Sequence, residues 1–239
     1  MNTLKKISKI AGVGYLFIFV TGIFSNFFVM ESLTVPGNAA ATVNNISDNQ
    51  SLYRIGILSF IIMVVWDVVL AWALYVLLKP VNENLSLLSG WLRLVNSAIF
   101  AIALFNLFNV LQIVSNADYL KVLSREHIST QVMQSFEAFN HTWLIGLVFF
   151  GLHLIVLGYL IFTSGYMPKF IGILLVIASI GYLTDSFANF LLTNYEDYKN
   201  IFSLIVIIPG VIGELSLTFW LLFKGVDLPE SKNVKKVLK

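Results

Sequence analysis

Long apolar runs alternate with short polar segments along the chain, and this pattern predicts membrane-spanning helices. A helix rises about 1.5 Å per residue, so roughly 20 apolar residues cross the hydrocarbon core of a bilayer, which is about 30 Å thick. The predicted helices are residues 8–29, 54–78, 88–115, 138–163, 168–193 and 200–223. The pattern therefore predicts an all-α integral membrane bundle of six transmembrane helices.

Two connections are longer than turns, and both fall on the same side of the predicted bundle. Residues 30–53 are small and polar, whereas residues 117–137 carry apolar side chains among charged ones. The second pattern predicts an amphipathic interfacial helix between helices 3 and 4, which would act as a lid or simply cover the bundle. We expect residues 1–225 to form one transmembrane domain and residues 226–239 to form a basic cytoplasmic tail.

Composition agrees with a membrane protein. The chain is 58% hydrophobic and 12% charged, with a mean hydropathy of +0.84, whereas soluble domains average about 25% charged residues. The absence of cysteine excludes disulfides and thiolate metal ligands. The basic residues lie near the predicted helix ends instead of in an aromatic-rich patch, so we expect no nucleic-acid partner.

The distribution of Lys and Arg predicts the orientation. A cytoplasmic N-terminus leaves only four of the fifteen basic residues outside, namely Arg54, Lys121, Arg125 and Lys199. The positive-inside rule then places both termini in the cytoplasm.

Charged residues inside the predicted spans are the candidate site. A charge at a helix centre costs at least about 2.5 to 3.5 kcal/mol, so such groups usually face the protein interior and have partners. Asp67, His153 and Glu214 lie near the midpoints of three different predicted helices. Asp185 lies nearer the outer end of its helix, and Arg93 lies just inside the cytoplasmic end of helix 3. These five residues are the predicted ligand- or ion-binding candidates.

Asparagines form a second tier of candidates. Asn96 lies one turn after Arg93, and Asn189 lies one turn after Asp185. Asn106 and Asn109 form a separate patch nearer the outer end of helix 3. Each either binds a ligand or makes a hydrogen bond between helices.

The leading hypothesis is binding of a small molecule or ion, coupled to transport or sensing through a midplane polar site. Three acids against one Arg favour a proton, a cation or an amine over an anion. In this hypothesis, Asp67 or His153 gains and loses a proton, and this titration drives the transport or sensing. Pro209 in IIPGVIGE predicts a kink or break in the helix before Glu214. Backbone carbonyls freed at this break could bind a cation.

Two other classes of function stay open at this point. A lipid hydrolase could use Asp67, His153, Asp185 and Glu214 as metal ligands, although no HExxH or paired-acid motif supports this, and we assign no metal and no cofactor. A non-catalytic accessory subunit would use Arg93, paired with Asp67 or Glu214, only to hold the bundle together. The oligomeric state is not predicted.

Several strings carry a family resemblance. YRIGIL followed by Asp67, WLRLVNSAI with Arg93, GLVFFGLHLIVLGYLIFTSGYMPKFIGILL with His153, and GYLTDSFANF with Asp185 resemble a bacterial membrane family catalogued as domain of unknown function 4386. The resemblance extends over about residues 8–223. It implies a multi-pass protein of the bacterial cytoplasmic membrane with unassigned biochemistry, in contact with the lipid bilayer.

Overall fold

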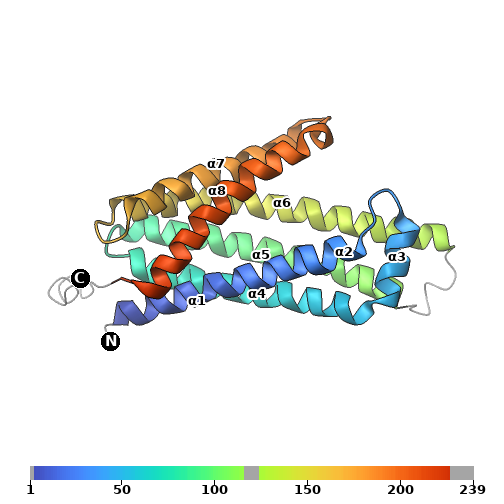
Figure 1. Ribbon diagram of the computed structural model, residues 1–239, viewed down its shortest axis with the longest axis horizontal. Coiled ribbons are helices and arrows are strands. Elements are labelled where there is room, and N and C mark those ends of the chain that lie inside the picture. Colours follow the sequence, from blue (N-terminus) through green and yellow to red (C-terminus); the bar gives the residue numbers. More distant parts are fainter. Residues whose placement is uncertain (1–2, 116–123, 227–239) are drawn as a thin grey trace. The chain divides into compact units, whose positions relative to one another are not determined.

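The computed structural model describes residues 3–115 and 124–226. Its elements (Figure 1) are α1 (Thr3–Ile23), the π-helix η1 (Phe24–Met30), α2 (Glu31–Leu33), α3 (Ala39–Asp48), α4 (Gln50–Leu78), α5 (Glu83–Val114), α6 (Arg125–Thr163), α7 (Lys169–Leu191) and α8 (Tyr195–Phe223). Every element in these residues is helical. The predicted all-α fold is confirmed.

Six helical stretches in the described residues are long and apolar enough to cross a membrane. They are Thr3–Leu33, Gln50–Leu78, Glu83–Val114, Arg125–Thr163, Lys169–Leu191 and Tyr195–Phe223. Each contains one of the predicted spans or most of it. The first stretch is continuous because α1, η1 and α2 follow one another without a break.

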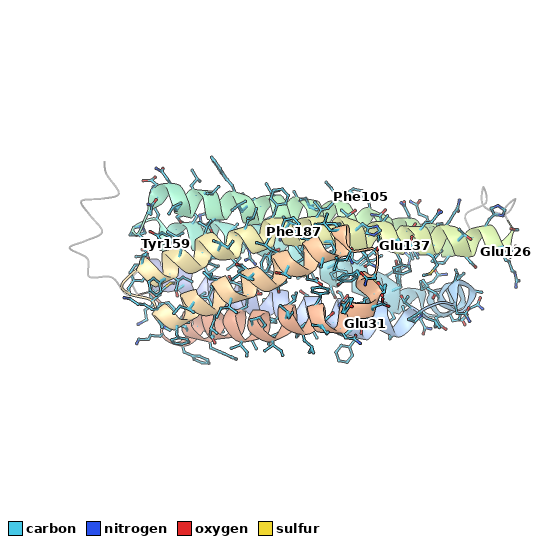
Figure 2. All side chains as sticks on the ribbon, turned by 90° about the horizontal axis from the view of Figure 1, so that it is seen from above. Glu31, Phe105, Glu126, Glu137, Tyr159 and Phe187 are labelled. Atoms are coloured by element: carbon cyan, nitrogen blue, oxygen red, sulfur yellow. The ribbon has the colours of Figure 1, made fainter. Side chains whose placement is uncertain are left out.

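The fourth spanning helix starts earlier than its predicted residue 138. Residues 125–137 are the first turns of α6 instead of a separate interfacial helix. No Gly or Pro interrupts this segment, so nothing in the sequence ends the helix. The segment is amphipathic, since Val132 and Phe136 are buried whereas Glu126 and Glu137 are exposed on its surface (Figure 2). Residues 117–123 of the predicted helix lie outside the described residues.

The predicted polar segment 30–53 also contains regular structure. The Asn38 side chain accepts a hydrogen bond of 3.0 Å from the Ala41 amide and caps α3, as expected of Asn at a helix start. Thr42 and Ile46, one turn apart, are buried. The small residues therefore form a short amphipathic helix, and α4 begins at Gln50 instead of Arg54.

The helix through IIPGVIGE is not broken, because α8 runs from Tyr195 to Phe223 with Pro209 inside it. Proline removes the amide that would bond the carbonyl four residues earlier, that of Ile205. A Cβ built on Gly181 of α7 would lie 2.5 Å from this carbonyl oxygen. The freed carbonyl therefore packs against the Gly181 backbone.

The chain divides into two compact units, each made of segments that are distant in sequence. The first unit is Met1–Leu16, Trp66–Asn96 and Gly146–Lys239, and the second is Phe17–Val65 and Ser97–Ile145. Helices α1, α4, α5 and α6 contribute one part to each unit. The single domain over residues 1–225 stays a prediction, and residues 227–239 of the predicted tail lie outside the described part of the chain.

In the first unit, glycines let neighbouring helices approach closely. α7 and α8 run side by side in opposite directions (Figure 1). α6 and α7 meet at Gly158 and Gly172, where a Cβ built on Gly172 would lie 2.5 Å from the Gly158 carbonyl oxygen. Small residues at helix contacts are typical of membrane bundles, in which packing replaces the hydrophobic effect between helices.

Hydrogen bonds from side chains tie helix ends together in the first unit. Ser8 of α1 donates to the Leu221 carbonyl at 3.2 Å and accepts from the Val226 amide at 3.3 Å. Tyr166, between α6 and α7, donates to the Leu77 carbonyl at 2.6 Å. Burial raises the pKa of the Tyr166 phenol, so this hydroxyl remains a donor.

The second unit is packed largely by aromatic rings. Phe100 of α5 stacks on Trp143 of α6 with ring centroids 3.6 Å apart, and Phe60 of α4 lies against Trp143 at 5.3 Å. Tyr53 of α4 donates a hydrogen bond of 3.1 Å to the Leu107 carbonyl of α5. These contacts hold the first turns of α4 against the last turns of α5.

Candidate functional site

A buried ion pair lies at the centre of the first unit. Nη2 of Arg93, on α5, lies 2.5 Å from Oδ1 of Asp67, on α4. The two residues are 1% and 3% exposed. Asn96, one turn after Arg93, donates to Oδ2 of Asp67 at 3.4 Å. Because both charges are buried and paired, the pair contributes no net charge to the interior.

His153, on α6, extends this network through both ring nitrogens. Its Nε2 lies 3.1 Å from Nη1 of Arg93, and its Nδ1 lies 2.9 Å from both the hydroxyl and the carbonyl oxygen of Ser89. A guanidinium can only donate hydrogen bonds, so Nε2 must accept. The proton is then on Nδ1, where it is donated to Ser89, and we assign His153 as a neutral imidazole.

Two aromatic rings lie close to the guanidinium. The Cζ atom of Arg93 lies 5.3 Å from the ring centroid of Tyr15, on α1, and 5.4 Å from that of Phe150, on α6. These separations are within the range of cation–π attraction. Nε of Arg93, Oδ1 of Asn96 and the Tyr15 hydroxyl have no hydrogen-bond partner within the described residues. The cluster therefore retains buried hydrogen-bonding capacity beyond the ion pair.

Glu214, on α8, is a second buried acid in the same unit. It is 7% exposed, and its Oε1 accepts a hydrogen bond of 3.3 Å from Tyr182 of α7. Gly210, one turn earlier, makes room for that phenol, since a Cβ there would lie 3.1 Å from the Tyr182 oxygen. Arg93 and Asp67 belong to the same unit. Among the described residues, however, the ion pair of Arg93 is with Asp67 and not with Glu214.

Asp185 has a different partner. Tyr195, the first residue of α8, donates to its Oδ1 at 2.6 Å, and the Tyr195 ring stacks on Phe202 at 5.5 Å. Asp185 and Asn189 are both half-buried on α7. The structure places this acid in a contact between the end of α7 and the start of α8, and not in the Arg93 network.

Asn106 and Asn109 are not part of the cluster around Arg93. Both belong to the second unit. Asn106 bonds its own helix, with Nδ2 3.3 Å from the Ala103 carbonyl, and Asn109 is exposed. Within the described residues, Asn96 is the one asparagine candidate with a hydrogen bond to a charged candidate, which is Asp67.

Four residues that contact the candidate site were not predicted from the sequence. Ser89 precedes Arg93 by four residues, so helical spacing could have identified it. Tyr15, Phe150 and Tyr182 are aromatic residues in a chain that is 14% aromatic, and no sequence signal distinguishes them from ordinary packing residues.

The residues do not form a metal-binding arrangement. Within residues 3–115 and 124–226, no group of three His, Asp or Glu side chains is placed to hold a metal ion. His153 also presents its free lone pair to the Arg93 guanidinium, and a metal cation at Nε2 would have to displace that positive group. The geometry therefore does not favour the metal-dependent hydrolase.

Comparison with known proteins identifies the family. A family model described as "Domain of unknown function (DUF4386)" matches residues 10–225. The chain belongs to this family. The DUF4386 match includes every residue of the Asp67–Arg93–His153 network and Glu214, and the predicted family is confirmed.

A curated relative and the solved structures add little about activity. An uncharacterized protein of the archaeon Archaeoglobus fulgidus is 33% identical over 174 residues, which cover 73% of this chain and 86% of that protein. No solved structure matches the chain significantly. The function of this DUF4386 protein must therefore be argued from its own site.

Proposed function

We propose that this multi-pass membrane protein binds a proton or small cation at Glu214, beside the Asp67–Arg93–His153 network, and couples this binding to transport or sensing. The observation that carries the proposal is a buried carboxyl, 7% exposed, whose side-chain partner in residues 3–115 and 124–226 is a phenol and not an arginine. An ionisable residue inside a spanning helix is by default a candidate for function.

The charges of the cluster support binding at Glu214. Asp67 and Arg93 neutralise one another, and His153 is assigned as neutral. An ionised Glu214 would leave one uncompensated negative charge in the interior, which costs several kcal/mol in a buried position. A bound proton or cation removes that cost, so this carboxyl is suited to exchanging one.

The same geometry disfavours Asp67 and His153 as the residues that gain and lose a proton. Protonating Asp67 would leave the buried Arg93 guanidinium without its counter-ion. Protonating His153 would place an N–H group against an N–H of Arg93, 3.1 Å away. We therefore assign the exchangeable charge to Glu214 and a supporting role to the ion pair.

The membrane and the orientation also belong to the proposal. The basic residues predict both termini in the cytoplasm, and we propose the bacterial cytoplasmic membrane as the location. The string IGIL occurs twice, at 55–58 and 171–174, near the start of the second and the fifth spanning helix. Two three-helix halves of opposite orientation would form an inverted repeat, an arrangement found in transporters. Both glycines of these strings make close contacts: a Cβ on Gly56 would lie 2.6 Å from Val29, and one on Gly172 would lie 2.5 Å from Gly158.

Ion flux in vesicles made with the purified protein tests the proposal. A potassium diffusion potential or a sodium gradient is imposed, and proton entry is followed with a trapped pH dye. The wild-type protein is expected to raise proton entry above that of protein-free vesicles, and Glu214→Gln is expected to abolish the increase. Glutamine keeps the size of the side chain and can accept the Tyr182 hydrogen bond.

Glu137→Gln is the matched control. Glu137 is exposed in the first half of α6, so its loss should leave the flux unchanged. A Glu214→Gln variant with wild-type flux would overturn the assignment to Glu214. Equal flux in wild-type and protein-free vesicles would overturn the transport form of the proposal.

A further inference from the structure

The second unit has a groove on its surface between α4 and α5. Its volume is about 210 Å³, and its lining is apolar, with Ile61 and Val65 on α4 and Ala101, Phe105 and Phe108 on α5. Val65 is 57% exposed and Phe105, labelled in Figure 2, is 67% exposed. Because both helices are long and apolar enough to cross a membrane, an apolar groove of this kind fits a lipid acyl chain.

The lining of the groove continues into a basic group on α4. At about 100° per residue, side chains at positions i, i+4, i+7 and i+11 share one face of a helix. Arg54, Leu58, Ile61 and Val65 have this spacing, and all four are exposed. The guanidinium of Arg54 therefore lies on the same face as the groove, nearer the end of the helix.

The facing helix has a matching arrangement. On α5, Ala101, Phe108 and Gln112 share one face by the same spacing, and Gln112 is exposed. Two hydrogen bonds show that the start of α4 lies against the end of α5: Ser115 donates to the Gln50 side chain at 3.5 Å, and Tyr53 donates to the Leu107 carbonyl at 3.1 Å. Arg54 and Gln112 therefore lie at the same end of the groove, which gives it one polar end and an apolar floor.

The length of this stripe matches one leaflet of a bilayer. Arg54 and Val65 are eleven residues apart, which corresponds to roughly 16 Å along the helix axis. Half of the hydrocarbon thickness is about 15 Å. A phosphate at Arg54 would thus place its acyl chain along the whole groove. A lipid with a zwitterionic headgroup would fill the groove equally well, but its own cation offsets the phosphate charge, so it would gain less from the arginine.

We propose that the α4–α5 groove binds one anionic phospholipid, with an acyl chain against Ala101 and Phe105 and the phosphate paired with Arg54. The occupant is a lipid of the leaflet on the Arg54 side. This inference does not depend on the function proposed for Glu214. It assigns the groove a bound lipid of defined charge in place of freely exchanging bilayer lipid.

Native mass spectrometry of the full-length protein in detergent tests the proposal, with dioleoyl phosphatidylglycerol and dioleoyl phosphatidylcholine titrated in turn. A lysine or arginine near a membrane surface favours an anionic lipid by an amount that corresponds to about fivefold in affinity. Wild-type protein is expected to bind the first phosphatidylglycerol about fivefold more tightly than phosphatidylcholine.

Two variants separate the headgroup from the acyl chain. Arg54→Gln should equalise the two affinities, whereas Ala101→Phe, which fills the groove, should weaken both. Ala101→Leu is a smaller filling variant that serves if the phenylalanine disturbs folding. Arg125→Gln, at an exposed basic residue at the start of α6, is the matched control and should keep the fivefold preference.

Two outcomes would overturn the inference. The first is an unchanged preference for phosphatidylglycerol in Arg54→Gln, which would place the anionic headgroup elsewhere. The second is unchanged binding of both lipids in a folded Ala101 variant, which would place the acyl chain outside the groove. Circular dichroism and gel filtration of each variant establish that it is folded.

Discussion

Nη1 of Arg93 lies 3.1 Å from Nε2 of His153, and this contact fixes which ring nitrogen carries the proton. The guanidinium has no lone pair to offer, so Nε2 must be the acceptor. The opposite nitrogen, Nδ1, faces Ser89, whose carbonyl oxygen can only accept. The imidazole thereby connects the ion pair on α4 and α5 to the backbone of α5.

The tautomer can be measured directly. In protein labelled with ¹⁵N-histidine, we expect one neutral ring with the proton on Nδ1 at neutral pH. It should be identified as His153 by its absence in His153→Gln, because the other two histidines, His127 and His141, are exposed on α6. Magic-angle-spinning NMR in lipid distinguishes the two nitrogens by their shifts. A doubly protonated His153, or one with its proton on Nε2, would contradict the Arg93 contact.

Removing one partner of the ion pair should destabilise the protein strongly. Asp67→Ala leaves a buried guanidinium unpaired, and such losses cost about 3 to 5 kcal/mol. Replacing both partners, as in Asp67→Ala with Arg93→Leu, should cost less than the sum of the two single changes. Unfolding by SDS titration measures each free energy.

The control for the ion pair is Asp48→Ala, at an exposed acid at the end of α3, which we expect to change the free energy of unfolding by less than about 0.5 kcal/mol. If Asp67→Ala were as mild as this control, the pair would contribute little to stability and the supporting role assigned to it would be wrong.

The close contact of α6 and α7 predicts a steric effect at Gly172. A Cβ there would meet the Gly158 carbonyl oxygen at 2.5 Å and the Phe162 amide nitrogen at 2.9 Å. Both are backbone atoms that cannot move independently of their helix. Gly172→Ala should therefore destabilise the protein by about 1 to 3 kcal/mol, measured as a lower melting temperature in detergent.

Gly90 offers a matched comparison in the same unit. A Cβ on Gly90 would have its nearest neighbour, the Ala71 carbonyl oxygen, at 3.6 Å, which is an ordinary contact. Gly90→Ala should be neutral or stabilising by up to about 1 kcal/mol, because alanine favours helix more than glycine does. Equal effects at Gly90 and Gly172 would mean that α6 and α7 are not in close contact.

The sequence predicts the spanning helices well because their signal is local. Each consists of an apolar run of sufficient length, and Lys169–Leu191, for example, differs from its predicted range by two residues at most. The predicted start of α6, at residue 138, was wrong. Residues 125–137 are less apolar than the residues that follow, but the helix runs through both segments without a break. Hydropathy predicts where a chain meets lipid, and helix ends depend on caps and breakers instead.

The candidate site was predictable only in part. The cost of burying charge in a membrane singled out Asp67, Arg93, His153 and Glu214. It could not predict that Arg93 would pair with Asp67 instead of Glu214, because that choice depends on how each helix is rotated. Asp185 was grouped with the others as a charge, but its partner is Tyr195, an aromatic residue at a helix start.

We propose that Glu214 carries an exchangeable proton or cation while Asp67 is held by Arg93. Dicyclohexylcarbodiimide, an apolar reagent that modifies protonated carboxyl groups in membranes, distinguishes these two acids. The reaction is run in choline buffer, free of sodium and potassium, and the modified peptides are mapped by mass spectrometry. We predict modification at Glu214, its loss in Glu214→Gln, and none at Asp67. Modification at Asp67 with Glu214 untouched would show that Asp67, and not Glu214, carries the exchangeable proton.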